Sequence, residues 1–254
     1  MRPNAARAVS ARRAPDLFKA LMLAFCALLL AAGAARAGDR ALLEIIGFSP
    51  DGRHFAFEEF GVQDGSGFPY SNIFIVDLDK DAWVPGTPLR HRIDDESIRV
   101  PRVRAEAMEE ARPILDRLEI AWPAETAFLL GDAVTDDGKR AVTGVPFYDA
   151  GRAVEDFILT VETFPTTSPL TCNDWFGREP MGMALTLEGP EGNVTEIMRD
   201  TALPRSRGCA FDYRLYGVFL PFHSQDFADA VVMVSVYPGG FEGPDRRFIA
   251  IPLR

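Results

Sequence analysis

The chain has 254 residues, of which 27 are Lys or Arg and 37 are Asp or Glu, so its net charge near neutral pH is −10. Residues 1–37 hold six of the basic residues and one acidic residue, which leaves 21 basic and 36 acidic residues, a net charge of −15, after residue 37. So negative a chain is not expected to bind nucleic acid or an anionic lipid surface, because both are recognised by clustered Lys and Arg.

The N-terminus has the three parts of a secretory signal peptide. Arginines but no acid occur in residues 1–15, a mostly apolar run extends from Leu17 to Ala35, and small residues at 35 and 37 precede the expected cleavage site. The apolar centre is shorter than the about 20 residues that a membrane-spanning helix needs. We therefore expect cleavage before Gly38 and a periplasmic or secreted protein, with an uncleaved N-terminal anchor as the alternative.

Two other forms of export signal fit the sequence less well. Cys26 does not resemble a lipidated cysteine, because the bulky Phe25 precedes it and the apolar run continues beyond it. The pair Arg12 and Arg13 is compatible with twin-arginine export, but Pro15 and Asp16 stand where that signal usually has apolar residues. General secretion is the preferred route, and no second apolar run has the length of a membrane span.

Removal of the signal peptide leaves two cysteines, Cys172 and Cys209. In an oxidising compartment two cysteines most simply form one disulfide. It would close a loop of about 37 residues, which contributes roughly 4 kcal/mol to stability in the chain-entropy model. A redox or metal role is disfavoured, because neither cysteine belongs to a CxxC motif or has a histidine nearby.

Residues 42–84 contain four short strand patterns separated by turn residues. The strands are expected at Leu42–Phe48, 53–61, Asn72–Leu78 and Ala82–Val84, and the turn Ser49–Gly52 contains Pro, Asp and Gly. This up-and-down order matches the content of one propeller blade.

Residues 47–57 resemble the TolB-type propeller repeat through their Phe-Ser-Pro-Asp-Gly core, and residues 72–78 resemble the next strand of that repeat. Strand, turn and hairpin patterns recur later at unequal spacings, around 134–142, 157–161, 215–221, 230–237 and 248–253. The expected fold is mainly β: residues 38–254 form one domain built as a degenerate propeller-like array of antiparallel strand units. A β-sandwich is the alternative.

One helix is expected to interrupt the strands. Residues 104–118 are rich in Ala, Glu and Arg, and Met108, Ala111, Leu115 and Leu118 share one helical face. Pro113 is expected to break or kink this helix.

Taken whole, the mature chain resembles a family of uncharacterised predicted secreted bacterial proteins. The signal peptide, the segments 47–53 and 70–77 and the two mature cysteines carry this resemblance. It implies neither an activity nor site residues.

The familiar signatures of catalysis and metal binding are missing from the sequence. The acids at 77, 79 and 81 resemble the start of a calcium loop, but Ala82 replaces the required Gly. None of His54, His91 and His223 has metal-ligand spacing to another histidine. No catalytic residue, metal site or cofactor is predicted.

The most unusual loop follows Cys172 and contains Trp175, Phe176 and Arg178. Aromatic and Arg side chains dominate contacts with binding partners, so these three are the candidate binding residues. The alternative is that the aromatic rings pack beneath the disulfide.

Three functions compete for this chain. The preferred one is a non-catalytic periplasmic binding or interaction protein with an unknown envelope protein or ligand as its partner. The second is an exported hydrolase with paired carboxylates, and the third is a structural envelope protein. Two carboxyl groups about 5–10 Å apart in a deep cleft would favour the hydrolase.

Overall fold

The first sheet is formed by strands β1 to β5 and is called here the N-terminal sheet. It contains β1 (Leu42–Phe48), β2 (His54–Val62), β3 (Pro69–Asp77), β4 (Ala82–Trp83) and β5 (Leu89–Arg92). The first four strands pair in chain order, and all pairs are antiparallel. Strand β4 pairs with the end of β3, and β5 pairs with the first half of β3. The up-and-down order predicted for residues 42–84 is therefore confirmed. This computed structural model describes residue 22 and residues 38–131, 137–147 and 152–254, so the expected signal peptide, its cleavage site and part of the turn at 134–142 lie outside the described residues.

Two further antiparallel sheets follow. The middle sheet has the order β13 (Arg247–Pro252), β12 (Val231–Pro238), β11 (Ala210–Pro221) and β6 (Ala124–Leu129). The outer sheet has the order β10 (Val194–Arg199), β9 (Met181–Glu188), β8 (Arg152–Pro165) and β7 (Arg140–Phe147). Short 3₁₀ turns, η1 (Arg205–Arg207) and η2 (Phe227–Asp229), precede β11 and β12.

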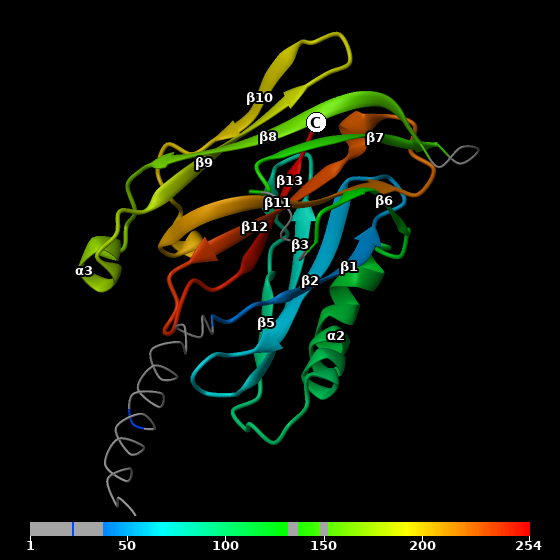
Figure 1. The fold of residues 1–254 in the computed structure, drawn as a ribbon. Helices are drawn as coiled ribbons and strands as arrows, with labels where there is room; N and C mark the ends of the chain where they lie inside the picture. Colours follow the sequence, from blue (N-terminus) through cyan, green and yellow to red (C-terminus); the bar gives the residue numbers. More distant parts are fainter. Residues whose placement is uncertain (1–21, 23–37, 132–136, 148–151) are drawn as a thin grey trace, which may run out of the picture. The chain divides into compact units, whose positions relative to one another are not determined.

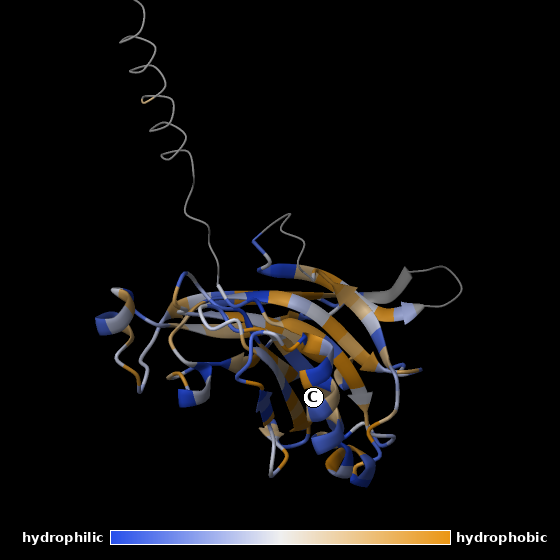
Figure 2. Ribbon diagram, turned by 90° about the horizontal axis from the view of Figure 1, so that it is seen from below, coloured by the Kyte–Doolittle hydropathy of each residue, from blue (hydrophilic) through white to orange (hydrophobic). Residues whose placement is uncertain are grey.

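The sheets pack face to face, with the middle sheet between the other two (Figure 1). Strand β12 illustrates why. Val232 and Val234 belong to the core shared with the outer sheet, whereas Val231 and Met233 belong to the core shared with the N-terminal sheet. A strand buried on both faces needs apolar side chains at nearly every position, which explains the apolar run of β12, interrupted by Ser235. Figure 2 shows the long strands as largely hydrophobic and many connecting segments as hydrophilic.

The expected helix is α2 (Val100–Arg117), and it covers the other face of the N-terminal sheet. Pro101 in its first turn is favourable there, since its missing N–H would have no helical partner, and the helix starts four residues earlier than predicted. The predicted face is largely confirmed, because Ala111 and Leu115 are buried against the sheet. Pro113 does not break the helix as expected; its ring lies on the exposed side. Among the described residues no helix is long and apolar enough to cross a membrane.

The mainly-β class is confirmed, but the propeller-like arrangement is not: the described strands form three stacked antiparallel sheets and no closed propeller. The TolB-like segment does form a sheet with the expected turn, since Ser49 Oγ accepts a hydrogen bond from the His54 amide at 2.9 Å. Its large side chains then bury against the middle sheet's face and α2 instead of against neighbouring blades. A local repeat pattern specifies a β-meander and leaves the packing of its faces open.

The Cys172–Cys209 disulfide is confirmed, with 5.4 Å between the two Cα atoms. The segment after Cys172 differs from the expected loop: residues Cys172–Phe176 form the short helix α3, which ends at Gly177 with a left-handed backbone. Glycine favours that conformation because it has no Cβ, so Gly177 provides the stop signal. The disulfide joins α3 to the start of β11 and forms a small core with Phe211.

Candidate functional site

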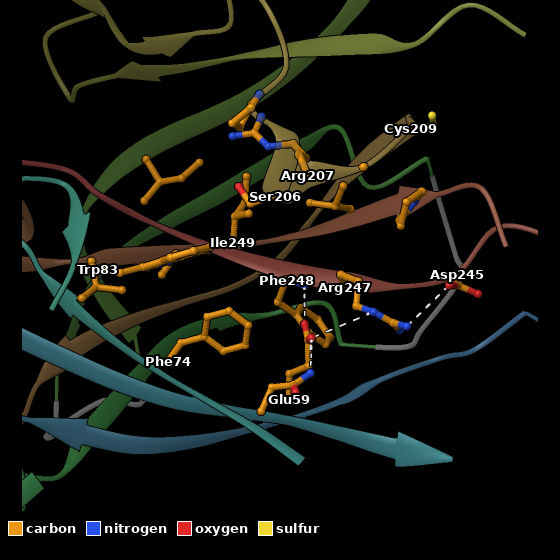
Figure 3. Close-up of a pocket in the computed structure, with 18 of the residues that line it drawn as sticks. Glu59, Phe74, Trp83, Ser206, Arg207, Cys209, Asp245, Arg247, Phe248 and Ile249 are labelled. Atoms are coloured by element: carbon orange, nitrogen blue, oxygen red, sulfur yellow. Dashed lines mark hydrogen bonds and ion pairs between the residues drawn. The ribbon is translucent and has the colours of Figure 1, made fainter. Parts of the chain in front are cut away.

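A cleft of about 670 Å³ lies beside β13, the edge strand of the middle sheet. We call it the β13 cleft. Strands β2, β3 and β4 form one wall, η1 and α3 form the other, and β13 itself lies between them (Figure 3). Its apolar lining includes Phe57, Phe74, Trp83, Trp175, Phe176, Met198, Ile249 and Ile251. The volume falls in the range of roughly 300–1,000 Å³ that is usual for ligand sites.

The aromatic wall is built by strand register. Phe57 and Phe74 are directly paired across β2 and β3, and their rings stack with centroids 4.8 Å apart. The β3–β4 turn then brings Trp83 opposite Val76, where its ring meets Phe74 edge-on at 6.0 Å. Trp83 remains 44% exposed, although its ring is large and apolar. Phe57 and Phe74 are buried, so Trp83 is the ring of this wall that the described part of the chain leaves exposed.

The polar end of the cleft is a cluster around Arg247, which we call the arginine cluster. The guanidinium lies 2.6 Å from Asp39 Oδ2 and 3.4 Å from Asp245 Oδ2, and its Nε is 4.0 Å from Glu59 Oε1. Tyr70 donates its hydroxyl hydrogen to Asp39 Oδ1 at 2.8 Å. One arginine thus holds three carboxyl groups that come from three separate parts of the chain.

Burial shapes the charge of this cluster. It raises the pKa of Glu59 and the pKa of Asp245, and the positive charge of Arg247 only partly offsets this. Burial likewise raises the pKa of the Tyr70 hydroxyl. Burial by itself would lower the pKa of Arg247, but Tyr70 and the carboxylates outweigh it and raise that pKa. The arginine therefore stays charged and keeps the cluster together.

Glu59 and Asp245, two of the three acids that line the β13 cleft, are already hydrogen-bonded, and the third, Asp81, is an exposed residue of the β3–β4 turn. Glu59 accepts the Phe248 amide at 3.0 Å and the Asn72 side-chain amide at 3.2 Å (Figure 3). Asp245 accepts the Asp39 amide at 3.0 Å. These contacts fix the positions of strands and leave little acceptor capacity for substrate, so the cluster has mainly a structural role.

Arg90 differs from the other arginines of this region. It lines both the β13 cleft and a neighbouring hollow of about 280 Å³, which also borders the arginine cluster. Its side chain is exposed, with the guanidinium 5.9 Å from the Trp83 ring centroid. Within the described part of the chain it forms no ion pair. On the opposite wall, Arg207 is held by Asp200 at 2.7 Å.

The structure separates the three binding residues proposed from the sequence. Trp175 and Phe176 line the β13 cleft, and Trp175 is 63% exposed. Phe176 also packs edge-on against Phe211 at 5.5 Å, beneath the disulfide. Arg178 does not line the cleft; its guanidinium stacks on the Phe211 ring at 4.6 Å. Phe176 therefore packs as the alternative describes, Arg178 lies on the same Phe211 ring, and Trp175 is exposed; a binding role for any of the three stays a prediction.

Two acids of the calcium-like segment form ion pairs at the β3–β4 turn. Asp77 pairs with Lys80, and Asp79 pairs with Arg53 and Arg254. His91 lies 3.1 Å from Glu106 on α2. The residues that the structure describes contain no group of three side chains suited to hold a metal ion.

Glu59, Arg90 and Arg247 were not among the residues predicted to form a site. Glu59 did leave a signal, since two consecutive glutamates interrupt the apolar strand 54–62, and both are buried. Buried carboxylates need partners, so this pair predicts cations on both faces of the strand. The partner Arg247 is 188 residues away in the sequence, and no local pattern marks it.

Comparison with protein families gives one match. Residues 56–254 match the model of a family whose description is "Predicted secreted protein (DUF2259)". The matched segment covers the middle and outer sheets and the N-terminal sheet from Ala56 onward, without β1, and it includes Cys172 and Cys209. No curated protein matches the chain.

Proposed function

The chain belongs to this family of predicted secreted proteins, and from that premise we propose that it is a non-catalytic binding protein of the periplasm or extracellular space whose ligand enters the β13 cleft. Export agrees with the family description, and the role in binding is our inference. The cleavable signal peptide expected at residues 1–37 belongs to the same proposal.

The observation that carries the proposal is the combination of Trp83 and Arg90. An exposed aromatic ring and an arginine without an ion pair among the described residues stand together at the mouth of a preformed cleft. Trp, Tyr and Arg are the side chains that contribute most to binding energy at interfaces. Trp175 faces the same cleft from the other wall, so a ligand entering it would meet aromatic surface on two sides.

A hydrolase is the second candidate, because burial raises the pKa values of Glu59 and Asp245, two of the three acids that line the cleft. A raised pKa is what a general acid needs. Against catalysis, each carboxyl group already accepts a backbone amide hydrogen and faces Arg247. A binding role is therefore favoured over catalysis.

Tryptophan fluorescence can test the proposal, because Trp83 and Trp175, two of the three tryptophans, line the cleft. Mature protein would be titrated with small-molecule, glycan, peptide and protein fractions of the envelope. We expect a saturable change in emission with one fraction. The response should be lost in Arg90→Ala and retained in Arg112→Ala, which removes an exposed arginine of α2 outside the cleft.

Three results would contradict the proposal of ligand binding in the β13 cleft. A response that survives equally in both arginine variants would place the ligand elsewhere. Release of a chemically altered compound, detected by mass spectrometry and abolished in Glu59→Gln, would favour the hydrolase. Absence of any response from every fraction would refute the cleft as a binding site.

A further inference from the structure

Among the strands that the structure describes, β13 has one neighbour in the middle sheet, β12, and its other edge faces the β13 cleft. The register shows which backbone groups face that way. The amides of Asp245 and Leu253 donate to Pro238 and Ala230 of the β12 side, at 2.8 and 3.1 Å. In an antiparallel pair the direction alternates, so the N–H and C=O groups of residues 246, 248 and 250, and the C=O group of Pro252, which has no N–H, point away from β12.

The first part of this edge is already paired within the protein. The Arg246 amide donates to the Asp39 carbonyl at 2.8 Å, and the Arg246 carbonyl accepts the Ala41 amide at 3.3 Å. The segment around Arg40 thereby forms a parallel bridge with β13. At the next outward position Glu59 accepts the Phe248 amide. The outer edge of β13 therefore already forms backbone hydrogen bonds with an extended segment, the one around Arg40.

Beyond that point the edge is open. The carbonyl of Phe248 and both backbone groups of Ala250 have no hydrogen-bond partner in the described ranges, and Ala250 is partly exposed. An unpaired strand edge is a template for another strand. The open stretch from 248 to 252 is roughly 13 Å long, at about 3.3 Å per residue.

The space beside the open edge has walls above and below it. Phe74 and Glu59 lie on one side of β13, and Ser206 and Arg207 lie on the other (Figure 3). A strand placed next to β13 would therefore continue the middle sheet between these walls. Its side chains would alternate between the aromatic wall at Trp83 and the wall at Arg207, because successive residues of a strand point to opposite faces.

We propose that the β13 cleft binds an extended peptide, which adds as a further strand to β13 through Phe248 and Ala250. This inference rests on the proposed binding function and names its ligand class. An apolar peptide side chain packs on Trp83, and an acidic side chain or terminal carboxylate pairs with Arg90, which has no carboxylate partner among the described residues. Main-chain pairing provides affinity and the flanking walls provide selectivity, as in other cases of strand addition.

The test uses substitutions that differ in one backbone hydrogen. Ala250→Pro removes the N–H that faces the cleft and leaves the pairing with β12 intact, and edge strands tolerate proline at such outward positions. Ala250→Ser is the matched control, because it retains that N–H. The probe is a set of octapeptides with alternating Val and Thr and one Glu at each position in turn. Chemical denaturation of each variant verifies folding.

We expect selected peptides to bind the natural protein and Ala250→Ser alike, and to bind Ala250→Pro about tenfold more weakly, since one backbone hydrogen bond is lost. Hydrogen exchange at Ala250 should slow on binding. If Ala250→Pro fails to fold, the exchange measurement and N-methylated peptides decide the matter, because a methylated amide cannot pair with the Phe248 carbonyl.

Three outcomes would overturn strand addition. Peptides that bind with equal affinity to both variants and leave Ala250 exchange unchanged would refute it, while cleft binding would stand. A glycan or small molecule that gives the Arg90-dependent fluorescence response when no peptide binds would do the same. Concentration-dependent dimerisation abolished by Ala250→Pro would assign the edge to a second copy of this chain.

Discussion

The buried ion pair between Glu58 and Arg104 joins α2 to the N-terminal sheet, and its loss should be costly. Arg104 contacts both carboxylate oxygens, with Nε at 3.0 Å from each and a terminal nitrogen at 2.7 Å from Oε2. The Glu58 side chain is 1% exposed. After Arg104→Ala, only the Ser71 hydroxyl would still donate to this carboxylate within the described structure.

The magnitude follows from this geometry. Removing one partner of a fully buried pair costs about 3–5 kcal/mol, because a charge is left in the interior without compensation. The Arg104 side chain is 33% exposed, so water can partly replace it and the cost falls. Loss of its stacking on the Phe60 ring, 3.8 Å away, adds a smaller term of about 0.5–1 kcal/mol. We expect Arg104→Ala to lower the free energy of unfolding by about 2–3 kcal/mol.

The assay is urea denaturation of the mature, oxidised protein, and the matched control lies on the same helix. Arg102→Ala removes an exposed pair with Glu106, at 2.9 Å, and should cost only about 0.3–0.5 kcal/mol. Both substitutions introduce the same helix-favouring residue, so helix propensity cancels in the comparison. A difference between the two variants below about 0.5 kcal/mol would refute the reasoning about burial.

Three other predictions concern the disulfide, the arginine cluster and export. Reducing the Cys172–Cys209 bond should lower the stability by up to roughly 4 kcal/mol, measured by denaturation with and without reductant, and thiol labelling of the denatured, non-reduced protein should modify neither cysteine. Burial raises the pKa of Glu59 above its usual 4.5, so the folded state binds this proton more tightly than the unfolded state. The stability that the proton contributes is present below pH 4.5 and is lost as the pH rises through the folded pKa. Glu59→Gln should flatten this part of the pH profile of unfolding, and an unchanged profile would contradict the assignment. Intact mass of protein taken from the envelope should correspond to a chain that begins at Gly38, and a mass that includes residues before Ala35 would contradict cleavage.

Much of the local structure was predictable because it depends on neighbouring residues. The turn at Ser49–Gly52, the strand ends near it and the apolar face of α2 all follow from short-range patterns. The disulfide was also predictable, since export and a count of two cysteines leave one simple pairing. Two short strands, β5 and β6, were missed, because Leu89–Arg92 is mostly charged and Ala124–Leu129 is only partly buried, so neither has a clear apolar alternation.

The β class, the main helix and the cross-link could be predicted from sequence patterns alone, and the export signal at residues 1–37 stays a prediction of the same kind. Tertiary structure alone decided how the sheets stack, because a strand pattern states which faces are apolar and does not state what covers them. It also decided the site. Glu59, Arg90 and Arg247 come from β2, β5 and β13. They line one cleft because the N-terminal and middle sheets, which are far apart in the sequence, pack against each other. The open edge of β13 has the same origin: residues 248–252 read as an ordinary strand, and only the absence of a second neighbour in the described sheet turns that strand into a surface for binding.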